Sequence, residues 1–440
     1  MNSIKNSLLR DFAKYSSLNI LGMIGLSCYI LADTFFVSKA LGATGLAALN
    51  LSIPIFNVVH GLGLMIGIGG ATRFSILKSQ NEDEKAQIAF STSIKVGFWI
   101  GILLVIIGIL GSERLALLFG ADMVTLPYTN TYLITILVFS PFFILNNTLL
   151  AFVRNDHNPR LSMIAMLVGS FSNIILDYIF MFPLKMGMFG AAFATCLAPI
   201  ISLCILSFHF VERKNLAALV KTKMLWSLVP DLFSLGLSAL IIEISSGIVL
   251  ITFNLVILGL EGNLGVAAYG IVANLALVVI AIFTGLAQGT QPLASKFYGL
   301  REHQSVNKLL KYAFVTSISI ALIIYFSFFI FAESIVGIFN SEDHARVSEI
   351  AVTGLRIYSL GFFFAGINII AAIFLGATEK ARAAFSISIA RGIIIIVPLV
   401  LMLSRIWNLY GVWLSFIITE LIVAVLAIYL SKSILKNMLP

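Results

Sequence analysis

Carboxylates lie within almost wholly apolar stretches of the sequence. Asp33 stands in YILADTFFVSKALG, Asp177 in SNIILDYIFMF and Glu243 in LIIEISSG. A carboxylate inside a membrane helix costs roughly a few kcal/mol or more, so it needs a partner or a water-filled cavity. If these stretches cross a membrane, the three residues are candidates for carrying a proton or a small cation, or for attracting a cationic substrate.

The composition indicates that these stretches do cross a membrane. Of the 440 residues, 60% are hydrophobic and 11% are charged, and the mean hydropathy is +1.04. A soluble fold could not cover that much apolar surface. We therefore expect an all-α integral membrane protein. A helix needs about 20 apolar residues to cross a bilayer, and the sequence predicts twelve such spans, at 16–39, 46–77, 88–112, 124–153, 161–183, 188–211, 231–259, 264–295, 308–334, 347–376, 383–404 and 408–431.

The distribution of lysine and arginine predicts the orientation, because positively charged loops stay on the cytoplasmic side. Most basic residues fall before the first span, in alternate loops or in the tail: Lys5, Arg10, Lys14, Lys78, Lys85, Arg154, Arg160, Arg213, Lys214, Lys221, Lys223, Lys296, Arg301, Lys308, Lys311, Lys380, Arg382, Lys432 and Lys436. Both termini are thus predicted to be cytoplasmic. The leader before the first span and the lack of targeting segments favour a multi-pass protein of a bacterial plasma membrane. Because the formal charge of +8 is scattered over many loops, we expect no nucleic-acid partner.

An internal repeat divides the chain. GLAALNLSIPIFNVVHGLGLMIGIGG, which starts at Gly45, is similar to GVAAYGIVANLALVVIAIFTGLAQGT, which starts at Gly265, and FVRNDHNPR is similar to FLGATEKAR at about the same shift. Parallel repeats are common in transporters. We predict two pseudo-symmetric six-helix bundles, at 1–211 and 231–440, joined by a cytoplasmic linker at 212–230, with alternating access between them.

The predicted spans bring five oxygen-bearing side chains to one region of the first bundle. Asp33 and Asp177 each lie six residues before the outer end of their span, and Thr195 lies seven residues after the start of its own. At about 1.5 Å per residue, all three lie roughly 10 Å below the outer surface. Tyr29 lies one helical turn further inward than Asp33, and Asn173 lies one turn further inward than Asp177, so each pair shares one face of its helix.

Such a cluster could bind either a proton or a small cation. Two close carboxylates in a medium of low dielectric cannot both stay ionised at low cost, so the pair can hold a proton near neutral pH. Alternatively, the oxygens of Asp33, Asn173 and Asp177 could bind Na⁺. Each residue also has a structural interpretation: Asn173 and Thr195 are polar residues of a kind that holds membrane helices together, and Glu243 could simply pair with a neighbour.

The same residues resemble a known family. ILADTFFVSKALGATGLAALNLSIP with Asp33, and VGSFSNIILDYIFMF with Asn173 and Asp177, are similar to the first and fifth helices of multidrug and toxic compound extrusion (MATE) transporters. The resemblance extends over essentially the whole chain. It implies an antiporter that exports organic cations or drugs in exchange for inward H⁺ or Na⁺, with Asp33, Asn173 and Asp177 in the cation site and Tyr29 and Thr195 around it.

The second half departs from one branch of that family. Glu243 resembles a seventh-helix glutamate which that branch pairs with a tenth-helix aspartate, but Ala365 stands at the aspartate's place and Asn368 follows one turn on. Asn254 is taken as the counterpart of Asp33. These departures favour coupling through the first bundle.

The substrate cavity is expected to be apolar and aromatic with a few polar groups, because flat cations stack on aromatic rings and flexible methionine suits varied ligands. The predicted partners are organic cations or drug-like small molecules and membrane lipid. We expect a monomer with no cofactor and no metal other than the possible Na⁺. The residues predicted to line the cavity are Glu243, Asn254, Asn368, Phe36 and Met65.

Other functions are less well supported. An enzyme is not expected, because His60 and His209 stand alone in apolar surroundings and no HExxH, Walker A or nucleophile elbow is present. The main alternative is a lipid-linked saccharide or lipid flippase of a related two-bundle family. Such a flippase should carry several cationic side chains in its cavity. A channel or a receptor would predict neither the repeat nor carboxylates at one depth.

Overall fold

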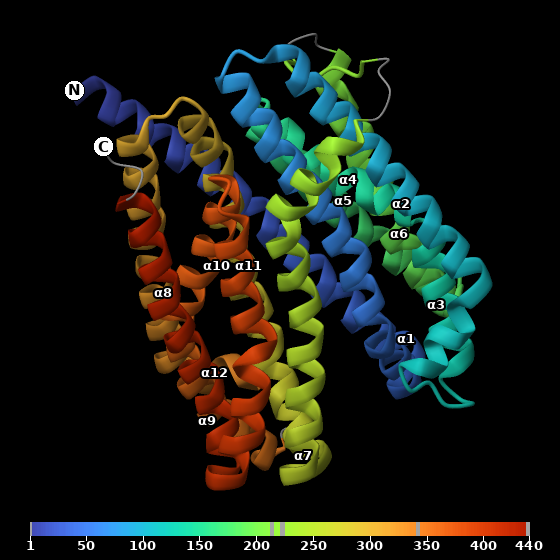
Figure 1. Cartoon of the computed structure of the whole chain (residues 1–440). Helices are drawn as coiled ribbons and strands as arrows, with labels where there is room; N and C mark the ends of the chain where they lie inside the picture. Colours follow the sequence, from blue (N-terminus) through green and yellow to red (C-terminus); the bar gives the residue numbers. More distant parts are fainter. Residues whose placement is uncertain (1, 212–214, 221–224, 340–343, 437–440) are drawn as a thin grey trace. The chain divides into compact units, whose positions relative to one another are not determined.

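The chain forms helices throughout the part that can be described. The computed structural model describes residues 2–211, 215–220, 225–339 and 344–436. Its helices are α1 (Asn2–Ser79), α2 (Asp83–Leu118), α3 (Leu126–Val138), α4 (Ser140–Asn155), α5 (Pro159–Met181), α6 (Gly187–Val211), η1 (Trp226–Leu228), α7 (Val229–Gly299), α8 (His303–Phe339), α9 (Ala345–Tyr358), η2 (Ser359–Gly361), α10 (Phe362–Ala377), α11 (Ala381–Ile389), η3 (Ala390–Ile394) and α12 (Ile396–Lys436) (Figure 1).

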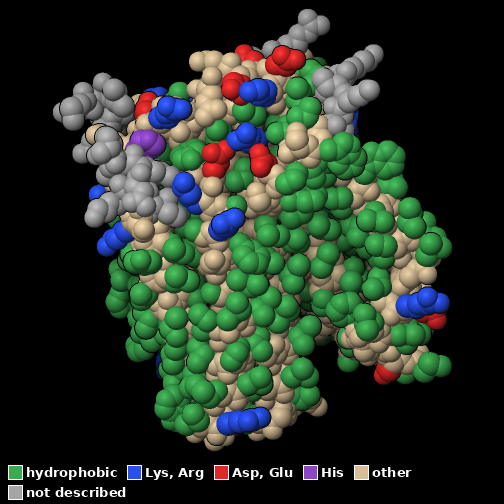
Figure 2. Space-filling model, viewed as in Figure 1, with side chains coloured by type: hydrophobic (Ala, Val, Ile, Leu, Met, Phe, Trp, Pro, Cys, Tyr) green, Lys and Arg blue, Asp and Glu red, His purple; other side chains and the backbone are tan. Residues whose placement is uncertain are grey.

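The helices are apolar enough to lie in a bilayer. Within the described residues, eight continuous helical stretches are long and apolar enough to cross a membrane, with α9 and α10 counted as one stretch and α11 and α12 as another. A ninth span arises if α3 and α4, which meet at a bend of 52°, are taken together. Figure 2 shows hydrophobic side chains along the visible helices and charged side chains mainly near their ends. Large apolar side chains such as Leu110 and Leu118 are almost 80% exposed, at 78% and 79%, as expected for contact with lipid. A multi-pass helical membrane protein is therefore confirmed.

The predicted count of twelve spans is not tested directly by these helices. α1, α7 and α12 each contain an internal break with non-helical backbone angles. The apolar part of α1, at 73 residues, would be about 110 Å long if straight, which is more than three times the thickness of a bilayer core. Each kinked helix is thus long enough to supply two spans.

Two glycines produce matching kinks in the two halves of the chain. Gly42 has φ 64° and ψ −155°, and Gly262 has φ 65° and ψ −154°, so equivalent positions differ by 220 residues here. Side chains with a Cβ rarely adopt this backbone conformation. The offset makes Phe253, which is fully buried, the counterpart of Asp33, rather than the neighbouring Asn254.

The chain packs into two compact units whose boundaries fall inside helices. The N-terminal unit contains 21–244 and 295–301, and the C-terminal unit contains 1–20, 245–294 and 302–440. The beginning of α1 therefore packs with the second half of the sequence, and the beginning of α7 packs with the first half. The unit boundaries do not fall in the segment 212–230, and the division into bundles at that segment stays a prediction.

Glycines at matching positions allow the starts of α1 and α7 to pack closely in these units. In the N-terminal unit, a Cβ on Gly69 would overlap the carbonyl oxygen of Leu232 at the start of α7. In the C-terminal unit, a Cβ on Gly289 would lie 2.7 Å from both Tyr15 O and Ser16 Cα in α1. Small residues permit such close approach between membrane helices. The sequence similarity of the segments containing Gly69 and Gly289 thus corresponds to the same packing in both units.

Candidate functional site

The predicted cation-site residues meet in the N-terminal unit. Asp33 lies in α1, Asn173 and Asp177 lie in α5, and Thr195 lies in α6; all four are buried, with Asn173 and Asp177 fully inaccessible. Tyr29 lies one turn before Asp33 and is half-buried. We call these five residues, together with Tyr132 of α3, the Asp33 cluster.

Asn173 joins α5 to α6 within this cluster. With one orientation of its amide, Nδ2 donates to Thr195 Oγ1 at 3.4 Å. With the opposite orientation, Nδ2 donates to Asp177 Oδ2 at 3.1 Å and Oδ1 accepts from the Thr195 backbone N–H at 3.1 Å. The hydrogen-bond partners decide between amide orientations, so we assign the second. Asn173 then fixes the position of the Asp177 carboxylate.

The two carboxylates are incompletely satisfied. Asp33 Oδ1 and Asp177 Oδ1 are fully buried and have no hydrogen-bond partner among the described residues. The two side chains also interact electrostatically. Buried polar atoms are normally paired, and two buried negative charges near each other are unfavourable. The chemistry of this site therefore suits a proton or a small hard cation that these oxygens would hold.

The structure adds Tyr132, which the sequence interpretation missed. This tyrosine of α3 is 4% exposed, and its phenol interacts electrostatically with Tyr29, Asp33 and Asp177. It lies eight residues after the start of the predicted span 124–153, which corresponds to a depth of about 12 Å. The same depth calculation could have identified it.

Glu243 has a partner. His60 Nδ1 lies 3.7 Å from Glu243 Oε2, with 15% and 23% of the two side chains exposed. The prediction that His60 stands alone is therefore wrong, because the fold brings α7 beside the second helix of α1. The His60 ring stacks on Phe56. Glu243 also interacts electrostatically with Tyr29, which places it within range of the Asp33 cluster.

The other predicted cavity residues are divided between the two units. Phe36 packs in the N-terminal unit against the rings of Tyr178 and Phe182, and Met65 is 5% exposed in the same unit. Asn254 and Asn368 belong to the C-terminal unit. A shared role for these residues in one cavity stays a prediction.

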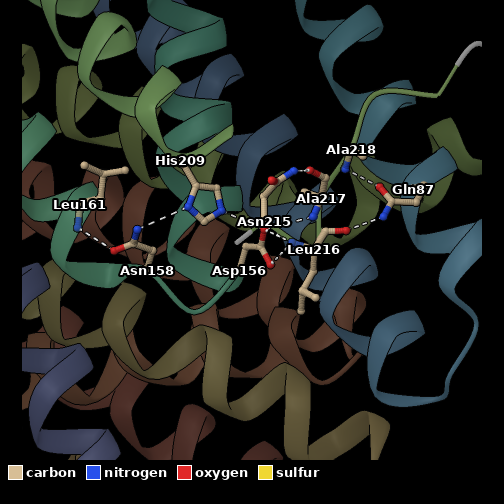
Figure 3. Close-up of polar contacts among 9 residues, drawn as sticks. All are labelled: Gln87, Asp156, Asn158, Leu161, His209, Asn215, Leu216, Ala217 and Ala218. Carbon is tan, nitrogen blue, oxygen red and sulfur yellow. Dashed lines mark hydrogen bonds and ion pairs between the residues drawn. The ribbon is translucent and has the colours of Figure 1, made fainter. Parts of the chain in front are cut away.

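A second polar cluster fastens the segment after α6 to the N-terminal unit (Figure 3). The buried Asp156, in the FVRNDHNPR motif, accepts hydrogen bonds from His209 Nε2 at 2.8 Å and from the backbone N–H groups of Leu216 and Ala217 at 2.8 and 3.0 Å. His209 is therefore not solitary, contrary to the prediction. Gln87 adds bonds to this segment through the Leu216 carbonyl and the Ala218 N–H.

Comparisons with known proteins show which family the sequence is similar to. The sequence profile of the MatE family matches residues 19–179 and 239–402. The chain is 28% identical over 431 residues to the multidrug export protein MepA of Staphylococcus saprophyticus, a match that covers 96% of this chain and 93% of that protein. MepA of Staphylococcus aureus is 27% identical over 439 residues, covering 97% and 95% of the two chains.

Solved structures share the fold. An outward-facing multidrug resistance MATE family transporter of the MOP superfamily superposes with a TM-score of 0.92 at 22% identity, covering 97% of this chain and 96% of that one. A MOP superfamily transporter from Pyrococcus furiosus gives a TM-score of 0.91 at the same identity and coverage.

Long apolar helices with matching kinks form a multi-pass membrane protein, and the family and relatives that it matches are transporters rather than enzymes. The family match covers well over half of the sequence. The chain belongs to the MatE family of multidrug and toxic compound extrusion transporters.

Proposed function

We propose that this protein is a secondary active antiporter that exports organic cations or other drug-like molecules in exchange for inward H⁺ or Na⁺. The observation that carries the proposal is that one buried carboxylate oxygen on each of Asp33 and Asp177 has no hydrogen-bond partner among the described residues. The relatives named multidrug export proteins support the substrate class.

The coupling ion would bind at the Asp33 cluster. Binding of one positive charge relieves the repulsion between Asp33 and Asp177 and supplies a partner for their unpaired oxygens. Asn173 holds the Asp177 carboxylate in place through the donation from Nδ2 to Oδ2. Occupation of the site would then favour one arrangement of the helices that carry these residues, which is the energetic requirement for coupling.

Glu243 would attract the cationic substrate. Its carboxylate is partly accessible and lies beside His60 rather than in a fully buried pair. Because Tyr29 of this cluster interacts electrostatically with Asp33, Asp177 and Glu243, a charge on Glu243 and a charge at the two aspartates affect each other. We infer that the exported cation and the inward ion compete through this electrostatic link, within an alternating-access cycle of a twelve-span protein whose termini are both cytoplasmic.

Ethidium efflux from proteoliposomes, under an imposed pH gradient or an imposed Na⁺ gradient, tests the proposal and identifies the ion. We expect efflux from the native protein under one gradient and its loss in Asp33→Asn and in Asp177→Asn. Asp83→Asn is the matched control, because that carboxylate is 73% exposed at the start of α2, and it should behave like the native protein.

Normal efflux by both the Asp33 and Asp177 variants would refute the assignment of the cation site. Loss of efflux counts in its favour only if the variants retain the thermal stability of the native protein in detergent. If the native protein exports ethidium under neither gradient, the antiporter proposal fails and a flippase with a lipid substrate becomes the next hypothesis to test.

A further inference from the structure

The C-terminal unit contains a buried charged cluster of its own, formed by Asn368 of α10, Arg391 of η3 and Glu420 of α12. Arg391 Nε donates to Glu420 Oε1 at 2.6 Å. Asn368 Nδ2 donates to the other carboxylate oxygen, Oε2, at 2.7 Å and to the Glu420 backbone carbonyl at 2.9 Å. The Arg391 side chain is 13% exposed and that of Glu420 is 2% exposed.

This cluster is deep in the predicted membrane region. Arg391 lies eight residues into the predicted span 383–404, and Glu420 lies twelve residues into 408–431, which correspond to about 12 and 18 Å from the span ends. Ionised side chains at such depth are expensive and mark functional sites more often than simple packing contacts. The pair has no counterpart in the Asp33 cluster, which contains no arginine.

The geometry of the pair leaves half of the guanidinium unused. Arginine offers five N–H groups, and with a carboxylate it often forms two parallel hydrogen bonds. Here Asn368 takes the second oxygen of Glu420. Arg391 makes its one bond through Nε, and its two terminal nitrogens bond to none of the residues that the structure describes. Among the described residues, the edge of the guanidinium that fits an oxyanion therefore has no hydrogen-bond partner.

The backbone around Arg391 is held in place. Arg391 lies in the π-helical turn η3, and such turns are frequent at functional sites because they redirect side chains. The next residue, Gly392, is so close to α7 that a Cβ there would overlap Ser245 Oγ. On α12, the ring of Phe416, four residues before Glu420, stacks on Tyr358 at 3.9 Å between centroids. Arg391 is thus positioned before any ligand binds.

We propose that Arg391 is the residue that binds the carboxylate, or a similar oxyanion, of a zwitterionic transported molecule. This inference rests on the proposed export function. Glu420 orients the guanidinium through Nε, and Asn368 holds Glu420 so that it does not occupy the terminal nitrogens. Arginine suits this role because it stays charged and presents two parallel donors to the planar oxyanion.

A matched pair of fluorescent substrates tests the proposal in proteoliposomes. A rhodamine methyl ester is a cation, and the corresponding free acid adds a carboxylate to the same ring system. The double variant Arg391→Gln with Glu420→Gln removes both charges and leaves a polar amide at each place, so neither charge is left buried without its partner. Arg391→Lys keeps the charge but lacks the two parallel donors.

We expect the native protein to export both dyes. In the double variant, export of the free acid should fall at least about tenfold, the loss expected when one charge-assisted hydrogen-bonded pair is removed, while export of the ester stays within about threefold of native. In Arg391→Lys, the free acid should again be affected more than the ester. Such a split distinguishes anion binding from a structural role, which would affect both dyes equally.

Several results would overturn the inference. It fails if the double variant exports both dyes normally, if it loses both equally, or if the native protein exports the ester but not the acid. It also fails if added anionic lipid inhibits export of the acid by the native protein but not by the variant, because the oxyanion at Arg391 would then be a lipid headgroup. Export of neither dye by the native protein would instead refute the proposed function.

Discussion

The Asp156 carboxylate holds residues 215–220 on the N-terminal unit, and replacing it by asparagine should release them. Its Oδ2 accepts hydrogen bonds from His209 Nε2 at 2.8 Å, from Leu216 N at 2.8 Å and from Ala217 N at 3.0 Å. A hydrogen bond to a charged group contributes about 1.5–3 kcal/mol, against about 0.5–1.5 kcal/mol for a neutral one. Weakening three such bonds costs about 3 kcal/mol, which is about 150-fold in the equilibrium for opening.

Hydrogen exchange followed by mass spectrometry measures this opening in peptides that cover 215–220. In Asp156→Asn, the amides of Leu216 and Ala217 should exchange about 100-fold faster than in the native protein. Asp122→Asn is the control, because Asp122 bonds only within its own turn and should leave these peptides unchanged. Exchange within about threefold of native in Asp156→Asn would refute the reasoning.

Three further changes should have measurable effects. Hydrogen bonds from Thr125 hold the pKa of Asp122 below its usual value of 3.8. The turn is therefore stabilised above pH 3.8 and loses this stabilisation as the pH falls through the lower folded-state pKa. Hydrogen exchange of the turn should show this loss at low pH, and Asp122→Asn should abolish the pH dependence. Gly69→Ala should lower the free energy of unfolding by about 1–3 kcal/mol or more, because its Cβ overlaps a backbone carbonyl of α7. Gly42→Ala should cost about 1–3 kcal/mol because of its φ of 64°. Thermal unfolding in detergent tests both. Gly111→Ala is the control that should not be destabilised, because no atom lies within 4 Å of that Cβ and alanine is favoured over glycine inside a helix. Equal stability of all three variants would contradict the packing and strain arguments.

The membrane class and the grouping of Asp33 with Asp177 could be predicted from the sequence. Apolar runs reveal spans because a bilayer requires them, and a constant rise per residue converts sequence position into depth. Tyr132 was within reach of the same calculation. The kink at Gly42 was not, because a glycine in an apolar helix can serve either close packing or an unusual backbone conformation.

Pairs between distant helices could not be predicted in this way. The contacts of His60 with Glu243, and of Arg391 with Glu420, join residues from different helices. Their partners depend on the rotation and packing of whole helices, about which a single sequence gives no signal. To choose between Phe253 and Asn254 as the counterpart of Asp33 requires the exact number of residues between equivalent positions in the two halves. The kinks at Gly42 and Gly262 give this number.

The exchange of helix ends between the two units affects how the protein can be assembled during synthesis. Residues 1–20 pack with a unit whose other members begin at 245, and their close partner Gly289 is made roughly 270 residues later than the segment it contacts. At about 5–20 residues per second, the start of α1 waits on the order of 10 to 50 s for that partner. The start of α1 is therefore made early and is among the last segments to reach its final position.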